Sequence, residues 1–113
     1  MQDSILNSIK KLLGIDSSYI HFDMDVMTHI NTAFMVLHQL GAGPIFSIHD
    51  ASTQWNAYSS DMEKLELIKT YIYLKVKLVF DPPQSSAVIE AIKTSISELE
   101  WRINVQVDPG EQE

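Results

Sequence analysis

The chain has 113 residues, a length that suits one domain, and 45% of them are hydrophobic, which is enough for a core. It contains no cysteine, so disulfides and thiolate chemistry are excluded, and zinc would have only histidine and carboxylate ligands. The formal net charge of −7 disfavours binding to a phosphate backbone, which requires clustered lysine and arginine. We expect a soluble protein made in a cytoplasm, because residues 1–14 lack the apolar stretch of a signal peptide and no apolar run could span a membrane.

Four helices are predicted in chain order from apolar residues that recur every three or four positions. The first covers residues 3–13 and ends at Gly14, a residue suited to the left-handed conformation after a helix. The second covers residues 23–40, with Asp23 as its predicted N-cap. It has a second apolar face, so we expect it to be buried on two sides, one of them against a partner subunit. The residues of that second face are Met24, Met27, Phe34 and Met35.

An irregular segment, residues 41–60, follows the second helix. The third helix covers residues 61–80, and Ser60 with Glu63 matches a capping box at its start. The fourth covers residues 85–105. We therefore predict an all-α fold, a small bundle of four main helices in a single domain over residues 1–107. Residues 108–113 are acidic and are predicted to form a flexible tail.

The stretch KLVFDPPQSS predicts a stop, a corner and a cap between the two longest helices. A proline disfavours helical geometry in the residue before it and cannot continue a helix itself, so the aspartate and two prolines end the third helix. One of the two serines then caps the fourth helix, and the two helices should pack as an antiparallel hairpin. A proline-rich ligand is the weaker interpretation, because such ligands need a longer exposed stretch. The corner residues are Asp81, Pro82, Pro83, Ser85 and Ser86.

One cluster of titratable residues has the composition of a metal site, namely His21, Asp23, Asp25 and His29. Asp25 and His29 are four positions apart and share a helix face. The plainer interpretation is that the aspartates serve the helix start and His29 lies beside the core. The chain has no nucleophile elbow and no phosphate-binding loop. We therefore expect no catalytic residue, no cofactor, no bound metal and no enzymatic activity.

Nucleic-acid binding is also disfavoured, because the lysine pairs at residues 10–11 and 75–77 are small and are explained by helix C-termini. The two tryptophans are larger anomalies. Trp101 lies off the main apolar stripe of the fourth helix, so it either covers the end of the core or anchors an interface. The same choice applies to Trp55, in the irregular segment.

Four stretches of the chain carry a family resemblance over about residues 4–107: SIKKLLGI, HINTAFMVLHQLGAGP, IKTYIYLKVKLVFDPP and SSAVIEAIKTSISELEWRINVQ. In these stretches the chain resembles the head–tail connector, or adaptor, proteins of tailed phages and prophages of Gram-positive bacteria. The resemblance implies a small all-helical protein without enzymatic activity that forms a ring, commonly a dodecamer, beneath the portal protein. Such a ring extends the DNA channel and docks the stopper or tail-completion protein. Genomic DNA passes through it without sequence-specific binding, and no membrane is involved.

The resemblance also implies where contacts lie and where the protein is found. The candidate portal-facing residues are Trp101, Asn104, Val105, Gln106 and Val107. The candidates for contact with a neighbouring subunit or the stopper are Phe46, Ile48, Trp55 and Tyr58. The expected location is the virion, at the head–tail interface, and the host cytoplasm during assembly.

Two general properties of the chain agree with a ring of subunits. A helix that is apolar on two faces fits a closed contact between two different surfaces, and a negative net charge fits a channel that repels phosphates. Two alternatives stay open. One is a small helical interaction module, such as a phage regulator that binds a host protein, and the other is a histidine–carboxylate metal enzyme.

Overall fold

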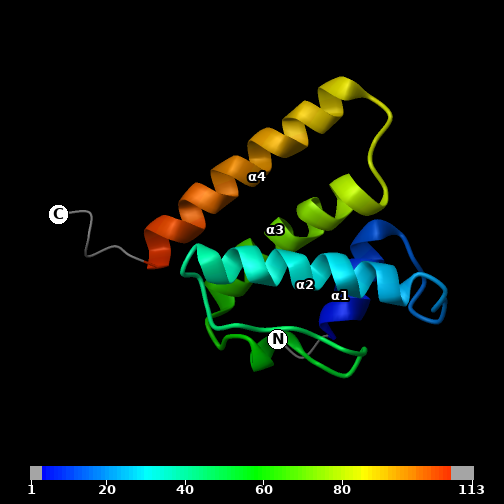
Figure 1. The fold of residues 1–113 in the computed structure, drawn as a ribbon, viewed down its shortest axis with the longest axis horizontal. Helices are drawn as coiled ribbons and strands as arrows, with labels where there is room; N and C mark the ends of the chain where they lie inside the picture. The colour runs from blue at the N-terminus through cyan, green and yellow to red at the C-terminus, as the bar shows by residue number, and fades with distance from the viewer. Residues whose placement is uncertain (1–3, 108–113) are drawn as a thin grey trace.

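The computed structural model describes residues 4–107, and their side chains as far as residue 104. The α-helices are α1 (Ile5–Leu13), α2 (Asp23–Gln39), α3 (Met62–Phe80) and α4 (Ser86–Val107), with a short 3-10 helix, η1 (Trp55–Ala57) (Figure 1). Within residues 4–107 there is no strand, and one isolated antiparallel bridge pairs Ser4 with Gln54. The predicted all-α bundle of four main helices is therefore confirmed. The predicted flexible tail lies outside the described residues.

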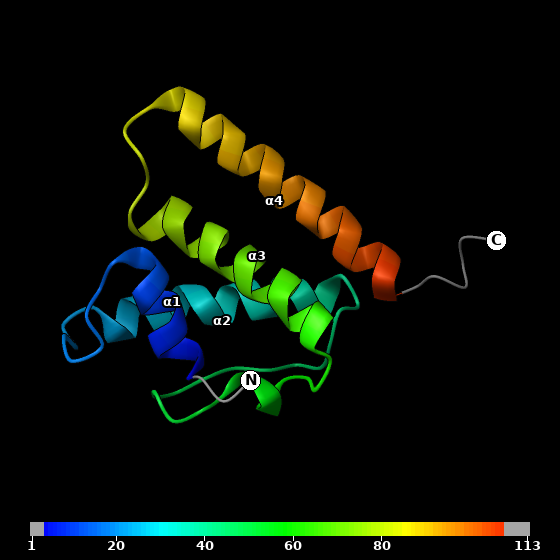
Figure 2. The same cartoon turned by 180° about the vertical axis from the view of Figure 1, so that it is seen from behind.

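α3 is the central helix of the molecule. It packs against each of the other three helices. Figures 1 and 2 show α4 along one edge of the molecule and residues 41–61 along the opposite edge. α3 can pack on several sides because it carries two apolar stripes, one through Ile72 and one through Tyr71, and both of these residues are buried. The other buried apolar residues are Ile5, Leu6, Ile9, Val26, Ile30, Ala33, Phe34, Leu37, Ala42, Ile48, Trp55, Tyr58, Leu65, Ile68, Val76, Ile96 and Ile103.

α1 is bounded by a cap at each end. The hydroxyl of Ser4 accepts a hydrogen bond from the backbone N–H of Asn7 at 3.2 Å, and the helix begins at Ile5. At the other end Gly14 has φ of 85°, the left-handed geometry that glycine adopts without strain. The predicted stop at Gly14 is confirmed, while Asp3, the predicted first residue, lies outside the described residues.

The predicted caps of α2 and α3 were both wrong by one residue. Asp23 is the first helical residue of α2, and the cap position is held by Phe22, whose side chain makes no capping bond. The carboxylate of Asp23 pairs instead with Lys10. At the start of α3 the capping residue is Asp61, whose Oδ1 accepts from the N–H of Lys64 at 3.1 Å, and not Ser60. An aspartate in extended geometry competes well for the cap, and local sequence does not decide between adjacent polar residues.

The corner between α3 and α4 has the predicted structure. Asp81 leaves the helix with φ of −145° and ψ of 65°, directly before Pro82. The hydroxyl of Ser85 accepts from the N–H of Val88 at 3.4 Å, so Ser85, one of the two predicted alternatives, caps α4 and the helix starts at Ser86. α4 then returns antiparallel along α3 (Figure 2). The predicted helical hairpin is confirmed.

The predicted second apolar face of α2 is only partly buried within the subunit. Phe34 lies in the core, where its ring contacts the rings of Phe46 and Tyr58, with both centroid distances 4.9 Å. Met24 and Met35, in contrast, are 75% and 49% exposed. The two methionines therefore lie on the outward side of α2, and burial of this face against a partner subunit stays a prediction.

Candidate functional site

The cluster of His21, Asp23, Asp25 and His29, which was weighed as a metal site in the sequence, does not come together in the described structure. Across residues 4–107, no three histidine or carboxylate side chains come close enough to hold an ion. Asp23 is committed to another partner, because its Oδ1 lies 2.7 Å from Nζ of Lys10. His21 lies in the loop between α1 and α2, whereas Asp23, Asp25 and His29 lie in α2.

Lys10 organises that loop, a role that sequence reasoning missed. Its side chain is 1% exposed. Besides the ion pair with Asp23, its ammonium donates to the carbonyl oxygens of Ser17 and Tyr19, at 3.2 and 2.7 Å. A buried ammonium needs such partners, since an unpaired charge in the interior is strongly unfavourable. The signal in the sequence was its position four residues after Leu6, on the buried face of α1.

The loop that Lys10 holds presents an aromatic cluster near the end of α3. The ring of Phe22 lies 5.7 Å from that of Tyr19, 4.9 Å from that of His21 and 5.3 Å from that of Phe80, measured between centroids. Phe22 and Tyr19 are exposed, and Ile20 between them is exposed as well. Ring pairs at these distances hold one another in place, so this part of the surface is apolar and ordered.

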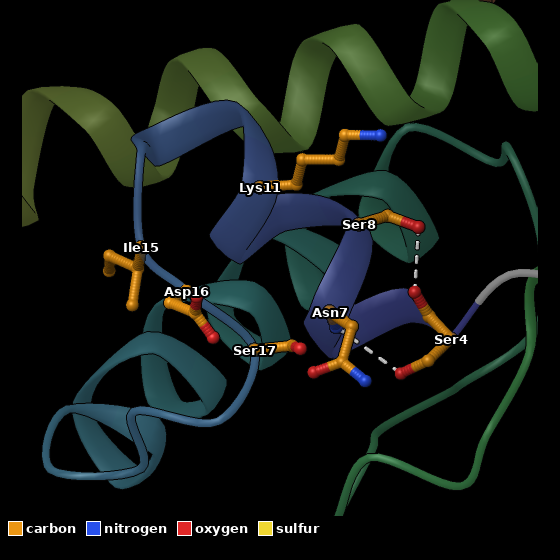
Figure 3. A pocket seen from close by; sticks show the side chains of 7 residues that line it. All are labelled: Ser4, Asn7, Ser8, Lys11, Ile15, Asp16 and Ser17. Atoms are coloured by element: carbon orange, nitrogen blue, oxygen red, sulfur yellow. Dashed lines mark hydrogen bonds between the residues drawn. The ribbon is translucent and has the colours of Figure 1, made fainter.

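A polar pocket of about 540 Å³ lies beside α1, between the helix and the chain that follows it (Figure 3). Its lining residues are Ser4, Asn7, Ser8, Lys11, Ile15, Asp16 and Ser17. The hydroxyl of Ser8 donates to the carbonyl of Ser4 at 2.7 Å. Hydrogen bonds from the backbone N–H and the hydroxyl of Ser18 hold the pKa of Asp16 below its usual range. The hydroxyl of Ser8 and the carboxylate of Asp16 therefore bond within the chain and maintain its local structure.

The four candidate residues of segment 41–60 pack inside the subunit. Trp55 and Ile48 are fully buried and Tyr58 nearly so, while Phe46 is half-buried against them. The indole N–H of Trp55 donates to the hydroxyl of Ser8 at 3.1 Å. These side chains serve the core, which settles the choice posed for Trp55. A contact with a neighbour or stopper through this segment stays a prediction, and it would use other side chains.

The backbone of segment 41–60 is tied to α2 by one side chain. The amide group of Asn31 donates to the carbonyl of Ile48 at 2.9 Å and accepts from the N–H of the same residue at 2.8 Å. This pair of bonds imitates the pairing of two strands and holds an irregular segment without regular structure of its own. Ile45, three residues before Ile48, is 74% exposed and is available for contacts.

The candidate portal-facing residues of α4 divide into three groups. Trp101 is 67% exposed, so it does not cover the end of this subunit's core. Asn104 is exposed, and its side-chain amide donates to the carbonyl of Leu40 at 3.2 Å, which ties the end of α4 to the end of α2. Residues 105–107 continue the helix, but their side chains lie outside the described part.

One hydrogen bond joins the middle of α3 to α4. The hydroxyl of Tyr71, a fully buried residue, donates to Oε2 of Glu100 at 2.8 Å. Burial, together with this bond and the charge of Glu100, raises the pKa of Tyr71 well above its usual range. Beside this bond runs a shallow groove of about 300 Å³ between the two helices, lined by Lys75, Leu78, Val79, Lys93, Ile96, Ser97 and Glu100.

The family model described as "Phage connector protein" matches residues 5–110, nearly the whole chain. The chain belongs to the phage connector protein family. No curated protein and no solved structure is significantly similar to it. The match confirms the resemblance that the four helical stretches indicated.

As a member of this family, the connector is a structural phage protein and a component of the virion. It associates with other proteins of the phage head or tail. None of the helices in the described part is long and apolar enough to cross a membrane. Exposed apolar side chains lie in the aromatic cluster, on α2 and α4, and at Ile45, among other places.

Proposed function

We propose that this connector is an adaptor subunit of a tailed-phage neck. Copies of the chain form a ring that docks beneath the portal protein after DNA packaging. The ring extends the DNA channel and joins the head to the stopper or tail-completion protein. Genomic DNA passes through the ring without sequence-specific contacts, and the subunits are present in the host cytoplasm before assembly.

The observation that carries this proposal is the family match over residues 5–110. Two properties of the chain support it. The formal net charge of −7 gives a surface that repels the DNA backbone, as a channel wall requires. The exposed apolar side chains lie on several separate elements, among them Ile20, Met24, Ile45 and Trp101, as expected for a subunit that contacts more than one partner.

The portal contact is proposed at the end of α4, residues 104–107. α4 ends here at Val107, while its other end follows the corner at residues 81–85 (Figure 1). Residues 41–60 are proposed to contact the stopper, with exposed Ile45 in place of the buried Trp55. Trp101 was also a candidate for the portal contact. We do not include it in the proposed contact, because it lies on the outer side of α4 rather than at the end of the helix.

Deletion of the gene from the phage tests the proposal. We expect heads that package DNA but fail to join tails or lose their DNA, and restoration of infectious particles when the gene is supplied in trans. In parallel, purified wild-type particles are analysed for the protein, which we expect them to contain. Infectious, tailed particles from the deletion phage would overturn the adaptor role.

A different outcome of the same experiment would support the alternative function. A helical interaction module that regulates the host would be absent from purified particles and would co-purify with a host protein from infected cells. The exposed aromatic cluster at Tyr19 and Phe22 is the surface such a module would use. Substitution of Tyr19 with serine should then release the host protein while leaving particle assembly unchanged.

A further inference from the structure

The outward side of α2 is an uncharged stripe on an acidic protein. Residues 26–49 contain no aspartate, glutamate, lysine or arginine, although the chain carries a net charge of −7. The exposed residues of the stripe are Met24, Thr28, Thr32 and Met35. At about 100° per residue these four lie within roughly a quarter of the helix circumference, along about 16 Å of its length. Asp25, in the first turn, bounds the stripe at one end.

The two threonines make this stripe less polar than its composition indicates. The hydroxyl of Thr28 donates to the carbonyl of Met24 at 2.9 Å, and the hydroxyl of Thr32 donates to the carbonyl of Thr28 at 3.0 Å. Both hydroxyl donors are therefore satisfied within the helix and need no partner from outside it. A partner that covers the stripe removes little polar surface from water, so the desolvation cost is small.

The outer side of α4 is the second exposed surface without local net charge. Its acidic and basic side chains pair with each other, Glu98 with Arg102 at 3.2 Å and Glu90 with Lys93 at 3.7 Å. Trp101, the largest exposed apolar side chain, lies beside the first of these pairs. Tryptophan is among the residues most enriched at the energetic centres of interfaces, and methionine sulfur makes favourable contacts with aromatic rings.

From these two surfaces we infer that the uncharged stripe of α2 binds the outer side of α4 in a second copy of this chain, with Trp101 packed against Met35. The occupant is a second copy because like-charged molecules repel one another wherever their carboxylates meet, and neither of these two surfaces carries a net charge. A basic partner would instead favour the acidic parts of the surface. The inference depends on the proposed function in one respect, that copies of the chain assemble side by side.

The positions of the two surfaces determine the kind of assembly. α2 and α4 each pack on α3, so they occupy different sides of the central helix and one copy can use both surfaces at once. Contact between two different surfaces is heterologous, and it continues from copy to copy until a ring closes. A pair of copies that used the same surface twice would stop at a dimer.

A charge placed on the stripe tests the contact. Thr32→Glu should weaken self-association about tenfold or more, because a carboxylate would be buried against an uncharged surface. Thr70→Glu is the matched control, since Thr70 is an exposed threonine on α3 outside both surfaces. Association is measured by sedimentation over a concentration series, and folding by circular dichroism. Equal association of the two variants would overturn the inference.

Cysteine pairs identify the two surfaces directly, because the chain has no cysteine of its own. A bismaleimide crosslinker should join Thr32→Cys/Ser97→Cys protein into a ladder of dimers, trimers and larger products, both in concentrated solution and in purified particles. Each single variant should give no ladder. The control pair Glu66→Cys/Gln84→Cys, at exposed positions away from both surfaces, should also give none.

The outcomes separate this inference from the proposed function. Protein that is present in particles but gives no ladder overturns the inference and leaves the adaptor role intact. Efficient dimers from Thr32→Cys alone mean that α2 meets α2, which also overturns it. Protein that is absent from particles but forms the ladder in solution overturns the adaptor role and supports the contact. Absence of the ladder in both settings overturns the contact.

Discussion

Lys10 and Asp23 form a buried ion pair that fastens the start of α2 to α1. Nζ of Lys10 lies 2.7 Å from Oδ1 of Asp23, and the same ammonium holds two carbonyl groups of the connecting loop. The lysine is almost fully buried, whereas the aspartate side chain is 22% exposed. The side chain of Lys10 therefore ties the loop that carries the exposed aromatic cluster to both neighbouring helices.

Replacing Lys10 with methionine should destabilise the protein by about 3 kcal/mol, because a partly buried carboxylate and two carbonyl groups lose their partner. Urea unfolding measures the loss. Lys11→Met is the matched control. Because Lys11 is exposed, this substitution should lower the free energy of unfolding by less than about 0.5 kcal/mol. Adding Asp23→Asn to Lys10→Met should recover part of the loss, because it removes the unpaired charge. Equal stability of the two lysine variants would contradict the assigned role of Lys10.

The bond from Tyr71 to Glu100 predicts a decline of stability in alkali. The pKa of Tyr71 is raised in the folded protein, chiefly by burial, so above about pH 10 the unfolded chain loses protons that the folded chain keeps. Stability therefore falls as the pH rises through that range. Burial raises the pKa of Tyr58 as well, in the same direction.

Tyr71→Phe should cost about 1–2 kcal/mol at neutral pH, through loss of the hydrogen bond to Glu100. It should also make the alkaline decline shallower. Unfolding in urea at about pH 8 and about pH 10.5 measures both effects. Tyr73→Phe, which removes the hydroxyl of a half-buried tyrosine on the same helix, is the control for loss of a tyrosine hydroxyl. An unchanged slope in Tyr71→Phe would rule out its hydroxyl as a source of the decline.

The side chain of Tyr58 packs so close to Gly43 that it leaves no room for a Cβ at position 43. A Cβ at this position would lie against the hydroxyl of Tyr58 and 2.7 Å from its Cζ. Gly43→Ala should therefore cost about 1–3 kcal/mol, as overpacking does. Tyr58→Phe by itself should be close to neutral, because that hydroxyl is buried without a hydrogen-bond partner. In combination, Tyr58→Phe should relieve part of the alanine's cost, and a double-mutant cycle of unfolding free energies that shows no coupling would refute the clash.

The corner at Pro82 and Pro83 should contribute to stability through the unfolded chain. Two prolines whose folded geometry is unstrained lower the conformational entropy of the unfolded chain. Replacing both with alanine should therefore lower the free energy of unfolding by about 1–2 kcal/mol. The variant should also allow α3 to run on past Asp81, which would increase helical circular dichroism and disturb the packing of α4. Ser86→Ala, one residue after the cap, is a control with little expected effect. Unchanged stability together with unchanged particle assembly would count against the role of this corner.

Much of the fold follows from short-range patterns. The spacing of Ile5, Ile9 and Leu13 marks α1, and Gly14 ends it for reasons contained in one residue. The corner at Asp81 follows equally from the prolines after it. Membership of the connector family is likewise carried by continuous stretches of sequence. These features could be predicted because each depends on residues within a turn or two of one another.

The sites were harder to predict than the helices. Trp55 and Trp101 were given the same two interpretations, yet one is fully buried on Ser8 and the other is 67% exposed. Asn31 was not singled out, although it holds the backbone of Ile48, 17 residues away. The carboxylate of Asp23 was assigned to a helix cap when its partner is Lys10.

By itself, the amino-acid sequence determined the number of helices, their order, the corner between the last two and the family. The tertiary structure decided which side chains are buried, which polar groups pair, and which apolar surfaces stay exposed for a partner. The physical reason is the distance along the chain between the residues that interact. Helix formation and termination depend on hydrogen bonds between near neighbours, whereas burial and ion pairing depend on which elements meet in space, and that is settled only when all the helices pack together.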